Sequence, residues 1–269
     1  MEDHQLDLGD EAQAGAVARY SEEDQSALEA HYDRFLGDNR FRMFHERISE
    51  YVHLDIYIYG TSPTRPFVTL ATSGMGAADV PRDSTKPTRR SELVTYVPHD
   101  WDFSSPEAAW LFARLFELAR FPHSSQEVMA KHHTMCIFDE RTNLADALFP
   151  GSLLTHWYLR SLINEPEEID HLILPSGQHL NFMWPYPITR HEYYFATQAS
   201  ETTDLEVELA THAPIPIDIH RQCIFSPENR HQKRTRLKEQ KRLARAMPKT
   251  PWMEIPCDLH PQQFTEPRK

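Results

Sequence analysis

The stretch that decides the fold reads VHLDIYIYGTSPTRPFVTLATSGM and runs from Val52 to Met75. Its first eight residues alternate strictly between two kinds of side chain, and a period of two is typical of a half-buried β-strand. Residues 60–66 hold a glycine and two prolines, which favour a turn. Residues 67–72 are rich in β-branched and aromatic side chains and predict a second strand. We therefore expect two neighbouring strands, a hairpin in the simplest case, that end at Ser73 and Gly74.

The alternation assigns the first strand to two faces of a sheet. Side chains at even positions are all aliphatic, whereas those at odd positions are polar or tyrosine. The predicted inward face carries Val52, Leu54, Ile56 and Ile58, and the other face carries His53, Asp55, Tyr57 and Tyr59.

Further elements extend this hairpin on both sides. Ser21 and Ser105 read as helix N-caps, and they open helices that end at Gly37 and at Pro122, respectively. Further strands are expected at 92–97, 134–138, 171–175 and 180–184, with helices at 190–198 and 204–211. Residues 40–48 fit either a strand or a short helix, and residues 145–161 are apolar but irregular. Strands and helices mix without a regular βα repeat, which predicts an α+β domain with a mixed β-sheet and helices packed over it.

The charge of the chain is unevenly distributed. The 269 residues include 28 lysines and arginines against 40 acidic residues, a net charge of -12. Residues 226–269 alone hold 11 basic and 5 acidic side chains. We therefore expect a disordered acidic tail at 1–20, one globular domain at 21–225 and a basic, proline-containing tail at 226–269. The acidic body repels nucleic acid and anionic membranes, so nucleic acid remains open only for the basic tail.

The three cysteines and the apolar segments indicate where the protein resides. Cys136, Cys223 and Cys257 are far apart and odd in number, which argues against a disulfide framework. The acidic N-terminus lacks the apolar run of a signal peptide, and no apolar stretch is long enough to span a membrane. The sequence predicts a cytoplasmic protein.

A catalytic or metal site would centre on His53, Asp55 and Ser73. Ser73 follows a strand, where a nucleophile elbow would lie, but that motif requires glycines where Ala71 and Met75 stand. No H-x-x-x-H pair and no phosphate-binding glycine loop occurs. We therefore predict no catalytic residue, cofactor or metal, and keep a hydrolase or metal-binding protein built on these three residues as the alternative.

The same residues resemble a family signature. His53 and Asp55, followed by RPFVTLATSGM at 65–75, are similar to the hallmark of the suppressor of fused domain. Weaker matches follow in the same order at Glu92-Leu93, Pro98, Asp100-Trp101, 118–122, 187–189 with Glu192, and Asp218 with Arg221. The resemblance covers roughly residues 25–225. The motif positions that it singles out, as structural or partner-binding residues, are His53, Asp55, Pro66, Phe67, Thr69, Thr72, Ser73, Gly74, Met75 and Trp101.

The resemblance implies a role as well as a fold. Members of this family are α+β protein-binding modules rather than enzymes, and no catalytic residues come with them. Animal members have a second domain and clamp an extended peptide between the two domains by strand pairing. This shorter chain resembles the bacterial members, which have been proposed as immunity proteins of polymorphic toxin systems. The resemblance thus implies a protein partner, a toxin in the case of the bacterial members, and no cofactor.

Overall fold

The N-terminal helix and the first four strands form the first half of the fold in this computed structural model. The structure describes residues 17–46, 49, 51–80, 90–136, 138–139, 144–145, 147–162, 165–198 and 203–225. Most of the predicted acidic tail and all of the predicted basic tail lie outside these residues. Residues 17–20 are described, and Ala18 forms an isolated bridge with Val52.

Helix α1 spans Glu22–Leu36 and begins and ends where the sequence predicts. The Ser21 hydroxyl accepts a hydrogen bond from the Asp24 amide at 3.1 Å, and three acidic residues occupy the first turn. These carboxylates face the positive end of the helix dipole. Gly37 follows the last turn with a φ of 99°, a conformation that glycine adopts without strain.

The predicted hairpin is confirmed as part of a four-stranded antiparallel meander. Its strands are β1 (Arg40–His45), β2 (Asp55–Tyr59), β3 (Phe67–Ser73) and β4 (Arg90–Pro98), with the 3-10 turn η1 (Met75–Ala77) after β3. Each strand pairs antiparallel with the next. The alternative left open for residues 40–48 is therefore decided in favour of a strand at Arg40–His45, and residues 47 and 48 lie outside the described part of the chain.

Helix α2 spans Pro106–Ser125, and Ser105 caps it as expected. The prediction that Pro122 ends this helix is wrong, because the helix continues for three more residues. Pro122 and His123 are buried, and the His123 ring bonds the Met75 carbonyl at 2.8 Å. This tertiary contact holds the last turn in place although proline removes one helical hydrogen bond.

The second half of the chain contributes short strands, one long strand and two helices. In order these are β5 (Thr134–Cys136), β6 (Phe138–Asp139), β7 (Leu144–Ala145), β8 (Leu154–Arg160), η2 (Glu167–Asp170), β9 (His171–Ile173), β10 (His179–Thr189), α3 (Arg190–Gln198) and α4 (Thr203–His212). The expectation of irregular structure for 145–161 is wrong where β8 forms. The predicted turn at 176–178 connects β9 to β10, which pair antiparallel.

The main sheet has eight strands in the order β1-β2-β3-β4-β10-β8-β5, with β9 also paired to β10. Strands β4 and β10 run parallel and the other pairs run antiparallel. The sheet is therefore mixed and the fold is α+β, as the sequence predicts. Strand β10 joins the two halves because it lies between β4 and β8.

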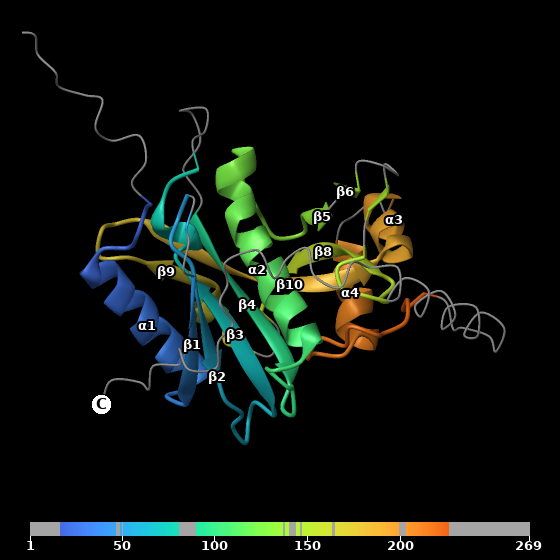
Figure 1. The fold of residues 1–269 in the computed structure, drawn as a ribbon, viewed down its shortest axis with the longest axis horizontal. Coiled ribbons are helices and arrows are strands. Elements are labelled where there is room, and N and C mark those ends of the chain that lie inside the picture. The colour runs from blue at the N-terminus through green and yellow to red at the C-terminus, as the bar shows by residue number, and fades with distance from the viewer. Residues whose placement is uncertain are drawn as a thin grey trace, which may run out of the picture.

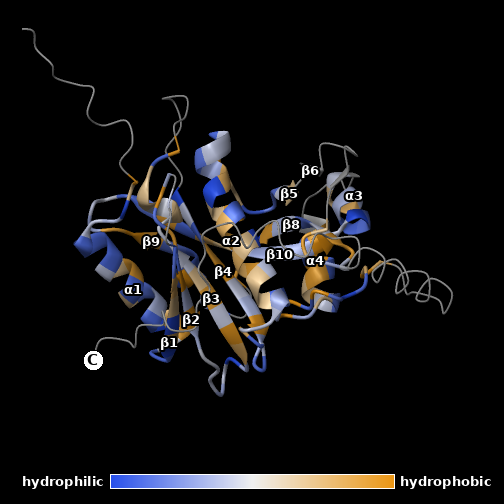
Figure 2. Ribbon diagram, in the orientation of Figure 1, coloured by the Kyte–Doolittle hydropathy of each residue, from blue (hydrophilic) through white to orange (hydrophobic). Residues whose placement is uncertain are grey.

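Both faces of the sheet are covered, so the expectation of a half-buried strand is wrong for β2. Ile56 and Ile58 pack in one apolar cluster together with α2, whereas Tyr57 and Tyr59 pack in a second cluster with α1, α3 and α4. Figure 1 shows α2 crossing one face of the sheet. Hydrophobic residues are concentrated in the strands and along α2 in Figure 2, whereas α1 is mostly hydrophilic. No helix among the described residues is long and apolar enough to span a bilayer.

Candidate functional site

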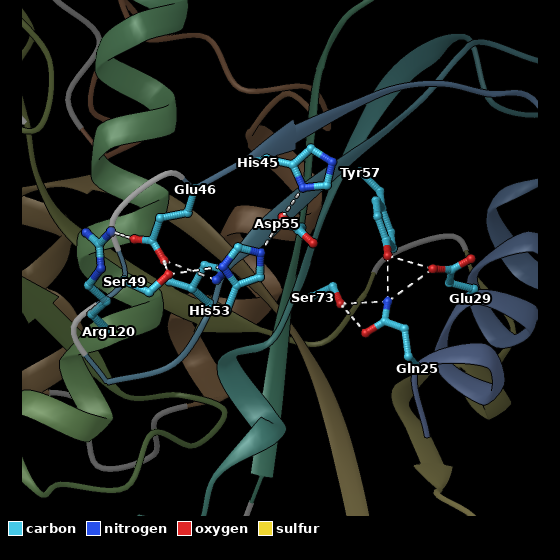
Figure 3. A network of polar contacts seen from close by, with 11 residues as sticks. Gln25, Glu29, His45, Glu46, Ser49, His53, Asp55, Tyr57, Ser73 and Arg120 are labelled. Carbon is cyan, nitrogen blue, oxygen red and sulfur yellow. Dashed lines mark hydrogen bonds and ion pairs between the residues drawn. The ribbon is translucent and has the colours of Figure 1, made fainter. Parts of the chain in front are cut away.

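Three neighbouring strands bring polar side chains into one row at the end of the sheet. His45 of β1 is the register partner of Asp55 in β2, and Asp55 is the register partner of Ser73 in β3. The loop before β2 adds His53 (Figure 3). The motif residues His53, Asp55 and Ser73 therefore lie close together, as the sequence alternative requires, but His45 joins them as well.

Asp55 is the centre of a cluster with two histidines. Its Oδ1 lies 2.8 Å from His45 Nδ1 and 3.4 Å from His53 Nε2. One donor atom from each of the three residues lies within 4.8 Å of the others. The hydrogen bond to Asp55 raises the pKa of His45, whereas burial lowers the pKa of His53.

Ser73 points away from this cluster and toward α1 (Figure 3). Its Oγ lies 3.2 Å from both the amide nitrogen and the amide oxygen of Gln25. Gln25 in turn donates to the Tyr57 hydroxyl at 2.6 Å, and that hydroxyl donates to Glu29 at 2.8 Å. A Ser-His-Asp relay needs the serine hydroxyl on the imidazole. The contacts described here instead tie Ser73 to the helix.

His53 is held from its other side by a chain of polar contacts. Its Nδ1 lies 3.1 Å from Ser49 Oγ, and Ser49 donates to Glu46 Oε2 at 2.8 Å. Glu46 is buried, accepts a hydrogen bond from the Leu54 amide at 3.1 Å and forms an ion pair with Arg120 of α2. The ring of His53 is thereby oriented with Nε2 toward Asp55.

The TSGM part of the motif wraps around a buried carboxylate, Glu92 of β4. Thr72 donates to Glu92 Oε2 at 2.6 Å, while Oε1 accepts from Tyr20 at 2.7 Å and from the amides of Gly74 and Gly76 at 2.9 and 3.0 Å. Burial raises the pKa of Glu92. Four donors compensate the loss of water around this group.

Gly74 occupies a position that no other residue fits. Its φ is 113°, in the left-handed region, and a Cβ at this position would lie 1.8 Å from the carbonyl oxygen of His53. Met75 follows, buried in the α2-side cluster. The backbone that carries His53 therefore rests directly on the motif glycine.

The first motif positions lie at the other end of β3. Arg65 donates to Thr69 Oγ1 at 2.8 Å and forms an ion pair with Glu165 at 2.9 Å. Phe67 is buried against Tyr96, with ring centroids 4.8 Å apart, and Pro66 is exposed in the hairpin turn.

Trp101 follows the end of β4 that pairs with Phe67, and the length of this strand separates it from Thr72, Ser73 and Gly74. It lines an open groove of about 420 Å³ between the end of β4, the start of α2 and residues 214–220. Four carboxylates border this groove, namely Asp100, Asp102, Glu107 and Asp218. The structure thus places Trp101 apart from the His53–Asp55 cluster.

Glu192 and Arg221 form a second buried polar centre. Thr189 and Glu192 make a reciprocal cap, with Glu192 Oε2 accepting from the Thr189 amide at 2.8 Å. Both carboxylate oxygens also accept from the Arg221 guanidinium, at 2.6 and 2.7 Å. These late motif positions fasten residues 218–225 to the end of β10.

The roles of two residues, His45 and Glu92, do not follow from the sequence. His45 lies in a segment whose conformation was undecided, and its approach to Asp55 depends on a strand register that no local pattern encodes. Glu92 was recognised only as a motif match, because a carboxylate in a strand reads as a solvent-facing residue. The sequence signal for its burial is the run of aliphatic, β-branched and aromatic residues, LVTYV, at 93–97.

Comparison with known families and structures identifies the class of protein. The family model for Suppressor of fused protein (SUFU) matches residues 50–222, which is more than half of the chain. The chain therefore belongs to the suppressor of fused family. The curated proteins yield no match to it.

Solved structures that share this fold include the following three. A suppressor of fused homologue from Neisseria gonorrhoeae has 16% identity and a TM-score of 0.55, with 77% of this chain and 98% of that chain covered. A Sufu-Fu complex has 9% identity and a TM-score of 0.53, covering 74% and 91%. Drosophila Suppressor of Fused has 11% identity and a TM-score of 0.51, covering 82% of this chain and 55% of its own.

Proposed function

We propose that this chain is a non-enzymatic protein-binding domain that acts in the cytoplasm as an immunity protein and neutralises a polymorphic toxin. Family membership supports the binding role, and a relative of the same fold is named as part of a Sufu-Fu complex. Cys136 and Cys223 are free thiols, which is consistent with a reducing compartment.

The observation that carries this proposal is the edge of the sheet at β1. This strand ends the strand order and pairs only with β2 among the described residues. Phe41, its second residue, lies at a shift in the register with β2 and is a large apolar side chain with 41% exposure. An edge strand with an exposed anchor side chain can pair with an extended segment of a partner.

The acidic charge of the protein supports a basic partner. The net charge is -12, although residues 226–269 are basic. Opposite charge on a toxin would accelerate association by electrostatic steering, and salt would slow it. The motif residues contribute to this role by fixing the hairpin behind β1.

The experiment that tests the function is calorimetric titration of the purified full chain with the product of a toxin gene adjacent to its own gene. We expect stoichiometric binding and loss of toxicity in cells that express both proteins. A neighbouring toxin that neither binds nor loses toxicity would refute the immunity role.

A pair of matched variants tests the surface. Phe41→Lys places a charge on the β1 edge, whereas Val207→Lys places the same charge on α4 at a valine with 63% exposure. We expect the first to weaken toxin binding at least tenfold and the second to leave it unchanged. Equal effects of the two variants would exclude β1 as the docking strand.

A further inference from the structure

The geometry points to a binding site for one divalent transition-metal ion of the zinc class, formed by His45, His53 and Asp55. This site lies beside the β1 edge, and its existence does not depend on the proposed partner. Two imidazoles and one carboxylate are a ligand set that zinc accepts, with a fourth position left for water or another ligand.

The donor atoms already have nearly the spacing that such an ion requires. Tetrahedral zinc with bonds of 2.0–2.2 Å holds its ligand atoms about 3.4 Å apart. His53 Nε2 and Asp55 Oδ1 are separated by 3.4 Å, and all three donor atoms lie within 4.8 Å. Only His45 must move, and its 44% exposed side chain can turn when the ion replaces its 2.8 Å contact with Asp55.

The hydrogen bonds around His53 leave a lone pair facing Asp55. The Ser49 hydroxyl has one hydrogen, which it donates to Glu46, so toward His53 Nδ1 it acts as an acceptor. Nδ1 therefore carries the hydrogen, and Nε2 of the neutral ring presents its lone pair to the Asp55 oxygen. A cation between these two atoms removes the repulsion.

The supporting contacts are those that a metal ligand requires. Metal-bound histidines usually donate their second ring hydrogen to a fixed acceptor, which orients the ring. Ser49 provides this acceptor, and the buried Glu46 with Arg120 and the Leu54 amide holds Ser49 in place. Figure 3 shows this chain running from α2 to the His53–Asp55 cluster.

One nearby charge opposes the site. Arg19 lowers the pKa of both His45 and His53, so its field also acts against a bound cation. Arg19 is exposed, and solvent screens it, whereas Asp55 supplies a negative charge in direct contact with the ion. The ion would connect β1 to β2 at their common end and stiffen the edge strand.

Zinc titration of the full chain, freed of metal by a chelator, tests the site. We expect one tight equivalent of Zn²⁺ by calorimetry and a visible absorption band when Co²⁺ replaces it. Asp55→Asn, His53→Gln and His45→Gln should each weaken binding by more than about 100-fold. His45 is half-exposed, so its variant remains folded even if the other two do not, and circular dichroism without metal checks this.

A matched histidine pair controls for adventitious binding. His171 and His179 lie 3.2 Å apart across β9 and β10 and are exposed. The double variant His171→Gln with His179→Gln should bind zinc as the unchanged protein does. The assignment is overturned if the tight site is absent, if it survives in all three ligand variants, or if it disappears in this control.

Ser49→Ala separates ligand orientation from simple stability. Removal of the acceptor on His53 Nδ1 should weaken zinc binding by about 10–100-fold while all three ligands remain. An unchanged zinc affinity in a folded Ser49→Ala protein would contradict the orientation that the site requires.

Discussion

At the scale of single residues, Thr72 explains why the motif needs a hydroxyl inside the sheet. Its Oγ1 donates to the buried Glu92 at 2.6 Å and accepts from the Leu93 amide at 2.8 Å. Valine has the same shape but neither function, so Thr72→Val leaves two buried polar groups of β4 without their partner. We expect the free energy of unfolding to fall by at least about 2 kcal/mol, measured by urea denaturation.

Thr95 on the same β4 strand is the control for this substitution. It is fully buried, and its hydroxyl has no hydrogen-bond partner among the described residues. Thr95→Val should therefore be neutral or stabilising, within about 0.5 kcal/mol. If both variants lose the same stability, the cost arises from shape rather than from the Glu92 contact.

Gly74 makes a second prediction at this scale. Alanine there would combine a left-handed backbone with a Cβ only 1.8 Å from the His53 carbonyl oxygen, an atom that cannot rotate away. We expect Gly74→Ala to cost more than about 3 kcal/mol or to prevent folding. Thermal unfolding followed by circular dichroism measures this.

Gly177 is the control that distinguishes backbone strain from the clash with the His53 carbonyl. Its φ is 80°, but a Cβ there would meet nothing within 4 Å. Gly177→Ala should cost only the backbone strain, about 1–2 kcal/mol. A similar loss at both glycines would mean that the contact with His53 carries no energy.

At the scale of elements, the strands whose two faces differ in character were predictable. The alternation at 52–59 correctly separated the aliphatic face from the tyrosine face of β2, because a period of two encodes the pleat. It did not reveal that the tyrosines are buried too, since Tyr57 and Tyr59 keep their hydroxyls bonded to acidic residues of α1. Tyrosine suits either environment, so its exposure depends on which helix covers the strand.

Strand β8 and the cluster around Asp55 were harder to predict from the sequence. Residues 154–160 are buried on both faces and lack alternation, and such a run does not distinguish a strand from other buried structure. His45 and Asp55 meet through pairing between segments ten residues apart, which depends on register rather than on local pattern. The motif hairpin was predicted, whereas the contact of His45 with Asp55 was not.

The prediction at the scale of elements concerns the ion pair between Glu192 and Arg221. Both side chains are buried, and two hydrogen bonds join them. Glu192→Gln leaves the buried charge of Arg221 unpaired, and Arg221→Met leaves that of Glu192 unpaired. Each variant should therefore cost about 3–5 kcal/mol of unfolding free energy. The double variant should cost much less than their sum in denaturation experiments.

A partly exposed ion pair between α1 and β1 provides the comparison. Glu29 and Arg40 are 3.2 Å apart with side chains 34% and 25% exposed. The same cycle there should give a coupling below about 1 kcal/mol. Equal coupling for the two pairs would mean that the Glu192–Arg221 pair does not secure residues 218–225.

At the scale of the whole molecule, acid should destabilise the fold through buried histidines. Burial, with Arg190 nearby, lowers the pKa of His156 from 6.5 to about 4. The folded state therefore binds this proton less readily than the unfolded state. The contribution of neutral His156 to the stability of the fold is complete above pH 6.5 and decreases as the pH falls toward 4. Between pH 7 and 5 it amounts to up to about 2 kcal/mol.

His156→Phe isolates this contribution, because phenylalanine can keep the stacking on Tyr193, whose ring lies 4.1 Å away. We expect the variant to lose less stability than the unchanged protein between pH 7 and 5, measured by urea denaturation. Parallel losses in the two proteins would assign the acid sensitivity to other groups, such as His31 and His123, whose pKa values burial also lowers.

The position of β10 has a consequence for how the protein is made. The meander from β1 to β4 comprises consecutive strands and can assemble while the ribosome is still working. Its exposed β4 edge must then wait until residues 180–183 emerge, since these close the parallel pair about ninety positions later in the chain. Such distant pairing slows folding and leaves the backbone hydrogen-bonding groups of the β4 edge unpaired during synthesis. Nascent chains that stop before β10 should therefore be the species that aggregate or recruit chaperones.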